Sequence, residues 1–151
     1  MIRKITEKDY EKVKKLVEQV HELHMRYRPD LFVNEGLLNT DYFNDIVNNS
    51  MSYVYDAGEE ILGVIVAFER GHKPIPILRK KRVCFVEILA VDEGHQHQGI
   101  GHALCDYLID ECKKNGLDTV ELFVYPFNAD ATEFYEEMGF AVKSVKYEYR
   151  L

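Results

Sequence analysis

Residues 83–124 restrict the fold more than any other part of this chain. Residues 83–91 are almost continuously apolar, which is typical of a strand that is buried on both faces of a sheet. A polar, glycine-containing turn follows, and residues 100–115 then carry an apolar helical face that ends at Gly116. Residues 119–124 are typical of a second strand. The stretch therefore predicts a parallel strand–helix–strand unit.

The segment before this unit predicts helices followed by an antiparallel hairpin. Thr6 and Asp9 resemble a capping box with Asp in place of the usual Glu, and the apolar residues after them keep helical spacing until shortly before Pro29. A second, shorter helix is expected over residues 41–48, where four apolar or aromatic side chains are placed for burial.

Two stretches, residues 51–57 and 61–70, are typical of strands, and residues 58–60 join them in a tight turn, which predicts a hairpin. Residues 71–82 contain two prolines and a basic run, which predict an exposed excursion between strands. The basic run could also steer an anionic ligand, although a solvated hairpin end is the preferred interpretation.

After the parallel unit, residues 129–138 predict a helix that Gly139 ends, and residues 141–149 predict a last strand. The expected fold is therefore α/β (α+β): a mixed sheet with N-terminal helices, an antiparallel hairpin, a parallel unit and helices on both faces. Residues 1–151 show no linker or repeat and are expected to form one domain.

Composition limits the function classes. The net charge of -7 argues against bulk nucleic-acid binding, because phosphate affinity depends on clustered Lys and Arg. No apolar run approaches the roughly 20 residues of a membrane helix, and the start resembles no signal peptide. The three cysteines follow no zinc-site spacing and suit a reducing compartment. We expect a cytoplasmic protein without a membrane partner.

The most informative segment is the glycine-rich turn at residues 96–101 (Gln-His-Gln-Gly-Ile-Gly). Glycines between a strand and a helix allow close approach of a ligand to free backbone N–H groups, which favours a phosphate or pyrophosphate. A nucleotide-hydrolysing loop needs Gly-Lys-Ser/Thr, but Gly101 is followed by His102. A dinucleotide fingerprint needs a third glycine, where this chain has Leu104. An ordinary structural turn is the alternative.

His95 and His97 flank the start of this turn and could suggest a metal site. No third ligand has suitable spacing, so loop histidines in contact with solvent are preferred and no metal is expected.

Two motifs together resemble the GNAT superfamily of N-acetyltransferases. The first is Gln96-x-x-Gly99-x-Gly101 after the strand at residues 86–91, which is similar to that family's acyl-coenzyme A signature. The second is the run at residues 128–140, with an Asn, then Ala, then Tyr, ending in Gly-Phe. The two motifs follow in the family's order, one helix and one strand apart.

The resemblance implies an acetyl-coenzyme A (acetyl-CoA) site. Backbone amides at the start of the helix would bind the pyrophosphate, and main-chain groups of the preceding strand would pair with the pantetheine arm at a splay in the sheet. Asn128 would reach the coenzyme arm, and Tyr135 would lie near the thioester sulfur. The full set of implied cofactor-binding residues is Leu89, Ala90, Val91, Gln96, Gln98, Gly99, Ile100, Gly101, His102, Asn128 and Tyr135.

Acyl transfer to an amine needs a base for the ammonium proton and benefits from an acid for the departing thiolate. Glu87 is the candidate base, because a carboxylate in an apolar strand is expected to be partly desolvated, with a raised pKa. Tyr135 is the candidate acid. Alternatively, Glu87 could pair with a Lys or Arg at a sheet edge, and Tyr135 could be a packing residue beside Phe134.

The leading hypothesis is an acetyl-CoA-dependent N-acetyltransferase that acts on a primary amine by direct attack in a ternary complex. A non-catalytic acyl-CoA-binding module is the alternative, and a different phosphate-ligand enzyme is disfavoured by the missing third glycine. The acceptor is open, with His21 and His24 as candidates to line its pocket or to lie at a helix edge. A homodimer through the last strands is compatible with the architecture.

Overall fold

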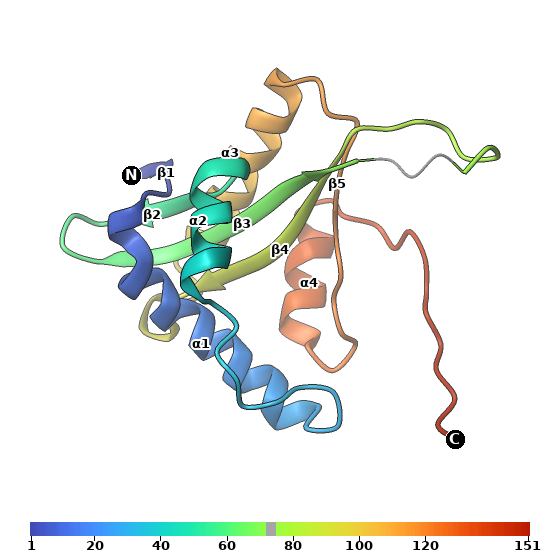
Figure 1. Ribbon diagram of the computed structural model, residues 1–151, viewed down its shortest axis with the longest axis horizontal. Coiled ribbons are helices and arrows are strands. Elements are labelled where there is room, and N and C mark those ends of the chain that lie inside the picture. The colour runs from blue at the N-terminus through green and yellow to red at the C-terminus, as the bar shows by residue number, and fades with distance from the viewer. Residues whose placement is uncertain (72–74) are drawn as a thin grey trace.

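The computed structural model describes residues 1–71 and 75–151 and contains a five-stranded mixed sheet (Figure 1). The strands lie in chain order, with antiparallel pairing among the first four and parallel pairing of the last two. The strands are β1 (Ile2–Lys4), β2 (Tyr53–Asp56), β3 (Ile61–Arg70), β4 (Val83–Val91) and β5 (Thr119–Leu122). The mixed sheet that the sequence predicts is confirmed. Part of the expected excursion, residues 72–74, lies outside the described residues.

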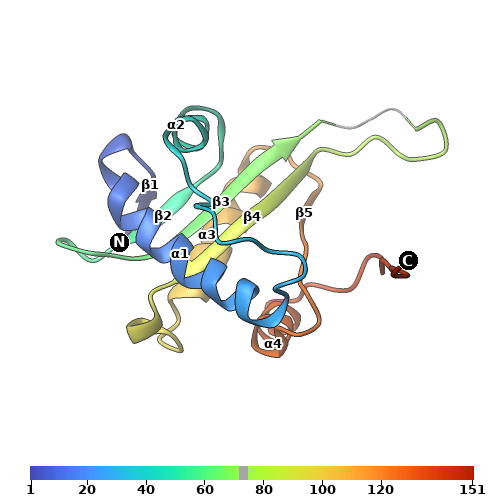
Figure 2. The ribbon, with the colours of Figure 1, turned by 60° about the horizontal axis from the view of Figure 1, so that its bottom comes forward.

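Helices cover both faces of the sheet, as expected (Figures 1 and 2). One face carries α1 (Tyr10–Tyr27) and α2 (Thr40–Asn49), and the other carries α3 (Ile100–Lys114) and α4 (Ala129–Glu137). Two one-turn 3-10 helices, Glu7–Asp9 and Glu93–His95, precede α1 and α3. In the described part of the chain, no helix is long and apolar enough to span a bilayer.

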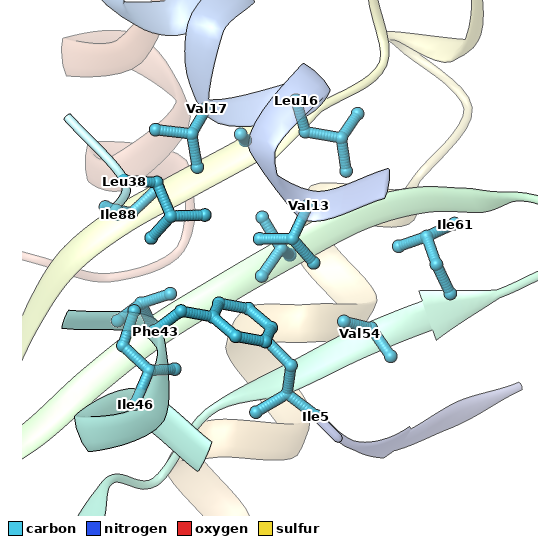
Figure 3. Close-up of a cluster of buried hydrophobic side chains, with 13 residues drawn as sticks. Ile5, Val13, Leu16, Val17, Leu38, Phe43, Ile46, Val54, Ile61 and Ile88 are labelled. Atoms are coloured by element: carbon cyan, nitrogen blue, oxygen red, sulfur yellow. The ribbon is translucent and has the colours of Figure 1, made fainter. Parts of the chain in front are cut away.

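Each face has its own apolar core. On the α1/α2 face, side chains of both helices meet those of β2, β3 and β4, as Figure 3 shows. The labelled residues are Ile5, Val13, Leu16, Val17, Leu38, Phe43, Ile46, Val54, Ile61 and Ile88. On the other face, Leu104 and Leu108 of α3 pack on Ile65 and Val86 of the sheet. Burial of these apolar faces holds the two helical layers in place.

The predicted capping box is present at the start of the one-turn 3-10 helix that leads into α1. The backbone N–H of Thr6 donates to Asp9 at 2.8 Å, and Arg3 forms two bonds of 2.8 Å to the same carboxylate. Burial tends to raise the pKa of Asp9, but the bonds from Arg3 and Thr6 outweigh it and lower this pKa below its usual range. The ionised carboxylate therefore joins β1 to the start of α1.

We expect this cluster to make folding sensitive to acid. Because the pKa of Asp9 is lower in the folded state, its contribution is present above about pH 4 and is lost as the pH falls through the folded-state pKa. Urea unfolding at pH 7 and pH 3 measures this effect. Asp9→Asn should lower the free energy of unfolding by about 1–2 kcal/mol at pH 7 and by less at pH 3. An equal loss at both pH values would contradict the argument.

Two features differ from the expected fold. A short strand, β1, precedes the first helix and pairs with β2, although three residues carry too little pattern to predict it. The predicted last strand at residues 141–149 is wrong for this structure, because residues 141–151 form no strand. Its alternating sequence is typical of a strand, but a strand also needs a neighbour with which its backbone can pair.

A bulge and a divergence interrupt β4 near its middle. Val66 lies opposite Ile88 and Ala67 lies opposite Val86, so Glu87 has no opposite residue on β3. The pairing of β4 with β5 ends at Val86. From Glu87 onward, the edge of β4 that faces β5 has no strand partner in the described chain, and the two ribbons diverge in Figure 2. The splay that the family resemblance implied is present.

Candidate active site

The start of α3 presents unbonded backbone amides to solvent. Gly99 is the N-cap and has a left-handed conformation with φ of 82°, which glycine adopts without strain. The first helical bond runs from the N–H of Ala103 to the carbonyl of Gly99. The amides from Gly99 to His102 have no acceptor among the described residues, as expected for the first turn of a helix. A Cβ at Gly99 would meet nothing within 4 Å.

This open amide cluster has the geometry of an anion site. The N–H groups of a first helical turn point outward together, and the positive end of the helix dipole lies behind them. Gln96 and Gln98, in the turn just before, are both exposed. The structure thus places Gln96, Gln98, Gly99, Ile100, Gly101 and His102 in one turn, as the sequence predicts.

A close approach between α3 and the sheet holds this turn in place. A Cβ at Gly63 of β3 would lie 2.8 Å from Cγ2 of Ile100 and 3.3 Å from the carbonyl oxygen of Ala90. Real Cβ atoms do not occupy such positions, so glycine allows Ile100 to contact the sheet directly.

The second motif lies against the start of α3. A Cβ at Gly101 would lie 3.3 Å from the Phe134 ring, and the ring of His102 lies 4.7 Å from that ring, centroid to centroid. Phe134 therefore joins α4 to the amide cluster. This contact brings the two sequence motifs together in space.

Tyr135 lies next to this contact and packs into the core on the α3 face. Its ring contacts those of Phe134 and Phe140 at 5.1 and 5.5 Å. Burial raises the pKa of the Tyr135 phenol, which keeps it protonated at neutral pH. Its hydroxyl has no hydrogen bond to the described residues but is not sealed from solvent. A protonated, accessible phenol can donate a proton.

Asn128 has a structural role that the sequence did not indicate. Its side-chain oxygen accepts a bond from the N–H of Ala131 at 3.2 Å and so caps α4. Its amide nitrogen donates to no described residue, which leaves it able to reach a ligand.

The second half of β4 has main-chain groups that face the gap between β4 and β5, which opens where their pairing ends at Val86. Leu89 and Val91 turn their side chains to the α3 face, and Ala90 turns to the other face. In a strand paired on one side only, about half of the N–H and C=O groups point away from the partner. An extended chain in the gap could pair with these groups, as pantetheine would.

Glu87 does not have the desolvated environment that was expected. The side chain is exposed, accepts a hydrogen bond from the Tyr42 hydroxyl and pairs with Arg70 at 3.6 Å. The expectation of partial desolvation is wrong because the bulge turns Glu87 out of the apolar strand toward α2. The alternative interpretation, a carboxylate paired with a cation, describes its surroundings.

Sequence reasoning missed Tyr42 and Arg70 as partners of Glu87. Burial raises the pKa of Tyr42 most, and its bond to Glu87 raises it further, so this phenol stays protonated and holds the carboxylate in place. Arg70 lies over the Phe85 ring, 3.5 Å from its centroid. The hairpin register would have placed Arg70 near β4, but nothing in the sequence places Tyr42 there.

Glu87 and Tyr135 lie on opposite faces of the sheet. Glu87 contacts α2 on the α1/α2 face, and Tyr135 packs on the α3 face. Both are near the place where β4 leaves β5. An acyl donor on the α3 face and an amine on the α1/α2 face could therefore meet through this gap.

His21 and His24 help to build an aromatic cluster between α1 and the segment after β5. His21 Nε2 lies 2.8 Å from the carbonyl oxygen of Val33. The His24 ring lies 5.1 Å from Phe32, 5.9 Å from Tyr125 and 5.8 Å from Phe127. These contacts join the loop after α1 to residues 125–127, which follow β5. An aromatic cluster in this position is compatible with one wall of an acceptor site.

The loop histidine His95 and Arg82 of the basic run, which the sequence singled out as possible ligand-binding residues, bond to neighbouring groups of the protein. His95 Nδ1 lies 2.8 Å from Asp92, and across residues 1–71 and 75–151 no three His, Cys, Asp or Glu side chains gather as metal ligands. Arg82 of the basic run bonds to Glu69 and to the carbonyl of Asn115, at the far end of α3 from the amide cluster. Arg82 is thus a structural residue rather than an anion ligand at that cluster.

Comparison with known proteins shows the same architecture. A model of the acetyltransferase (GNAT) family matches residues 17–140. A crystal structure of a mutant of the BH1408 protein from Bacillus halodurans is 33% identical, with a TM-score of 0.94 over 100% of this chain and 99% of that one. An aminoglycoside N-acetyltransferase, AAC(6')-Iy, in complex with CoA, has a TM-score of 0.75 at 16% identity and covers 100% and 98% of the two chains, which shows a shared fold.

Among curated proteins, the [ribosomal protein bS18]-alanine N-acetyltransferase of Escherichia coli (strain K12) is 43% identical over 61 residues. The match covers 40% of this chain and 41% of that protein, so the chain spans about two fifths of the length of this relative.

Proposed function

Because the chain belongs to the acetyltransferase (GNAT) family, we propose that it transfers an acetyl group from acetyl-CoA to a primary amine in a ternary complex. The observation that carries this proposal is the cluster of unbonded amides at the start of α3, next to the gap between β4 and β5. A pyrophosphate fits the amides, and an extended pantetheine arm fits the free edge of β4.

The same residues bind and orient the donor in this proposal. The amides from Gln98 to His102 hold the pyrophosphate, with Gln96 beside them, and Leu89, Ala90 and Val91 pair with the arm. The free amide of Asn128 bonds to the arm beyond the strand. When bound, acetyl-CoA supplies a thioester whose carbonyl carbon accepts the amine nitrogen.

Glu87 and Tyr135 supply the proton transfers. Glu87 takes a proton from the acceptor ammonium, directly or through water, so that the nitrogen has a free electron pair. As the C–N bond forms and the C–S bond breaks, the Tyr135 hydroxyl donates its proton to the departing sulfur. The nitrogen then loses its second proton to water, and Tyr135 regains a proton from water, which leaves the neutral amide, the free thiol of CoA and the restored phenol. No residue of the chain becomes acylated, so neither Cys84 nor Cys105 has a chemical role, and both are buried.

The proposed acceptor is a primary amine, which could belong to a small molecule, an antibiotic or a protein. Relatives and neighbours act, by their names, on a ribosomal protein alanine and on aminoglycosides. A small-molecule amine or a protein amine meets the same chemical requirement here.

The three cysteines are all free, which supports a reducing, cytoplasmic location.

Thermal unfolding with acetyl-CoA, CoA, NAD and ATP in parallel tests the donor site. A ligand at 100 times its Kd should add about 2.7 kcal/mol to the free energy of unfolding. We expect acetyl-CoA and CoA to raise Tm and NAD and ATP to leave it unchanged. A preference for NAD or ATP would contradict the proposed donor.

Thiol release across a panel of primary amines then tests the transfer. Acetyl-CoA-dependent thiol release with at least one amine is expected. Tight CoA binding without turnover on any amine would instead favour a non-catalytic acyl-CoA-binding module.

A further inference from the structure

The surface around Glu87 carries two opposite charges side by side. The Arg70 guanidinium lies 3.6 Å from the Glu87 carboxylate, which is longer than a hydrogen bond. About half of the Arg70 side chain is exposed to solvent. A guanidinium has five N–H donors in a planar fork that matches a carboxylate, so Arg70 can bind an anionic group of a ligand beside Glu87.

Two phenylalanine rings continue this surface toward β5. Phe85 lies opposite Phe68, which packs in the core of the α1/α2 face, so the Phe85 side chain is on the same face as Glu87. The Arg70 guanidinium lies over the Phe85 ring, and the Phe123 ring lies 5.3 Å from that ring, centroid to centroid. Phe123 is 79% exposed. The two rings thus present an apolar surface next to the charged pair.

We propose that the acceptor is an α-amino acid with an aromatic side chain, bound on the acceptor patch (Arg70, Phe85, Glu87 and Phe123). The inference rests on the proposed function and names its substrate class. The α-ammonium pairs with Glu87, which takes its proton, and the α-carboxylate pairs with Arg70. The aromatic side chain packs on the exposed ring of Phe123. Acetyl transfer then proceeds as described above and gives the N-acetyl amino acid and CoA.

The position of Arg70 favours this class over other amines. The ammonium and the carboxylate of an α-amino acid are attached to one carbon, so each meets its opposite charge when both lie against Glu87 and Arg70. A peptide N-terminus has a neutral amide in place of that carboxylate. A polycationic amine brings further positive charge next to the guanidinium, which is unfavourable.

Thiol release with L-phenylalanine, L-phenylalanine amide and L-alanine tests the contacts separately. L-Phenylalanine should have a kcat/KM about 10- to 100-fold above the other two, because the amide lacks the carboxylate and alanine lacks the ring. Arg70→Met should remove the preference over the amide, and Phe123→Ala should remove the preference over alanine. Arg26→Met is the matched control, since Arg26 is exposed on α1 and its variant should keep both preferences.

The outcomes separate this inference from the proposed function. If L-phenylalanine is no better a substrate than its amide, alanine or the aminoglycoside kanamycin, the inference is overturned while acetyl transfer stands. If no amine releases thiol, the proposed function fails, and calorimetric titration of L-phenylalanine into the CoA-saturated protein decides whether the acceptor patch binds an aromatic amino acid. Saturable binding that Arg70→Met weakens at least 10-fold supports the patch, and no saturable binding overturns it.

Discussion

Replacing Glu87 by Gln should lower kcat by about 10²- to 10⁴-fold, which is the usual contribution of a general base. The amide cannot accept the ammonium proton, but its oxygen can still accept the bond from Tyr42, so the local structure should survive. The amide cluster that holds acetyl-CoA lies elsewhere, at the start of α3. The Kd for acetyl-CoA should therefore change by less than about 2-fold on this argument.

Steady-state kinetics from pH 5 to pH 9 provide the check, with thiol release as the signal. Glu60→Gln is the matched control, because Glu60 is exposed in the turn between β2 and β3 and should leave kcat unchanged. Glu87→Gln should be slower than both the wild type and this control at every pH measured. A variant with wild-type rates across the pH range would remove Glu87 as the base.

Replacing Gly63 by Val should destabilise the fold by about 3 kcal/mol and weaken acetyl-CoA binding as well. A Cβ at this position would lie 2.8 Å from Cγ2 of Ile100 and 3.3 Å from a backbone oxygen. Neither atom is the free end of a flexible side chain, so α3 must move away from β3. That movement displaces the first turn of α3, where the amides that bind pyrophosphate are placed.

Urea unfolding and calorimetric titration with CoA measure the two effects separately. Gly36→Val is the matched control, since a Cβ at Gly36 would meet nothing within 4 Å. Gly63→Ala should give a smaller loss of the same kind, about 1–2 kcal/mol. If Gly63→Val lowered stability but left CoA affinity unchanged, the position of α3 would not control the amide cluster.

The bulge at Glu87 connects the fold to the proposed chemistry. One extra residue in β4 turns a carboxylate out of the strand and coincides with the place where β4 leaves β5. Bulges often redirect a side chain and end strand pairing in this way. The same local irregularity thus supplies both the candidate base and the opening through which donor and acceptor would meet.

The amide cluster could be predicted from sequence because its causes are local. Glycines at residues 99 and 101, between an apolar strand and a helical pattern, are enough to indicate exposed N–H groups at a helix start. The environment of Glu87 could not be predicted in this way. Its partners Tyr42 and Arg70 lie 45 and 17 positions away in the sequence, on elements whose relative placement depends on packing.

Hydrophobic periodicity and glycine placement act over a few residues, so they are enough to predict the order of most strands and helices, the glycine turn and the order of the two motifs. The place where β4 and β5 separate, the direction of the Glu87 side chain and the absence of pairing at residues 141–151 depend on the folded chain. Strand pairing and register depend on contacts between residues far apart in the chain, so a strand-forming sequence becomes a strand only where another edge is free to receive it.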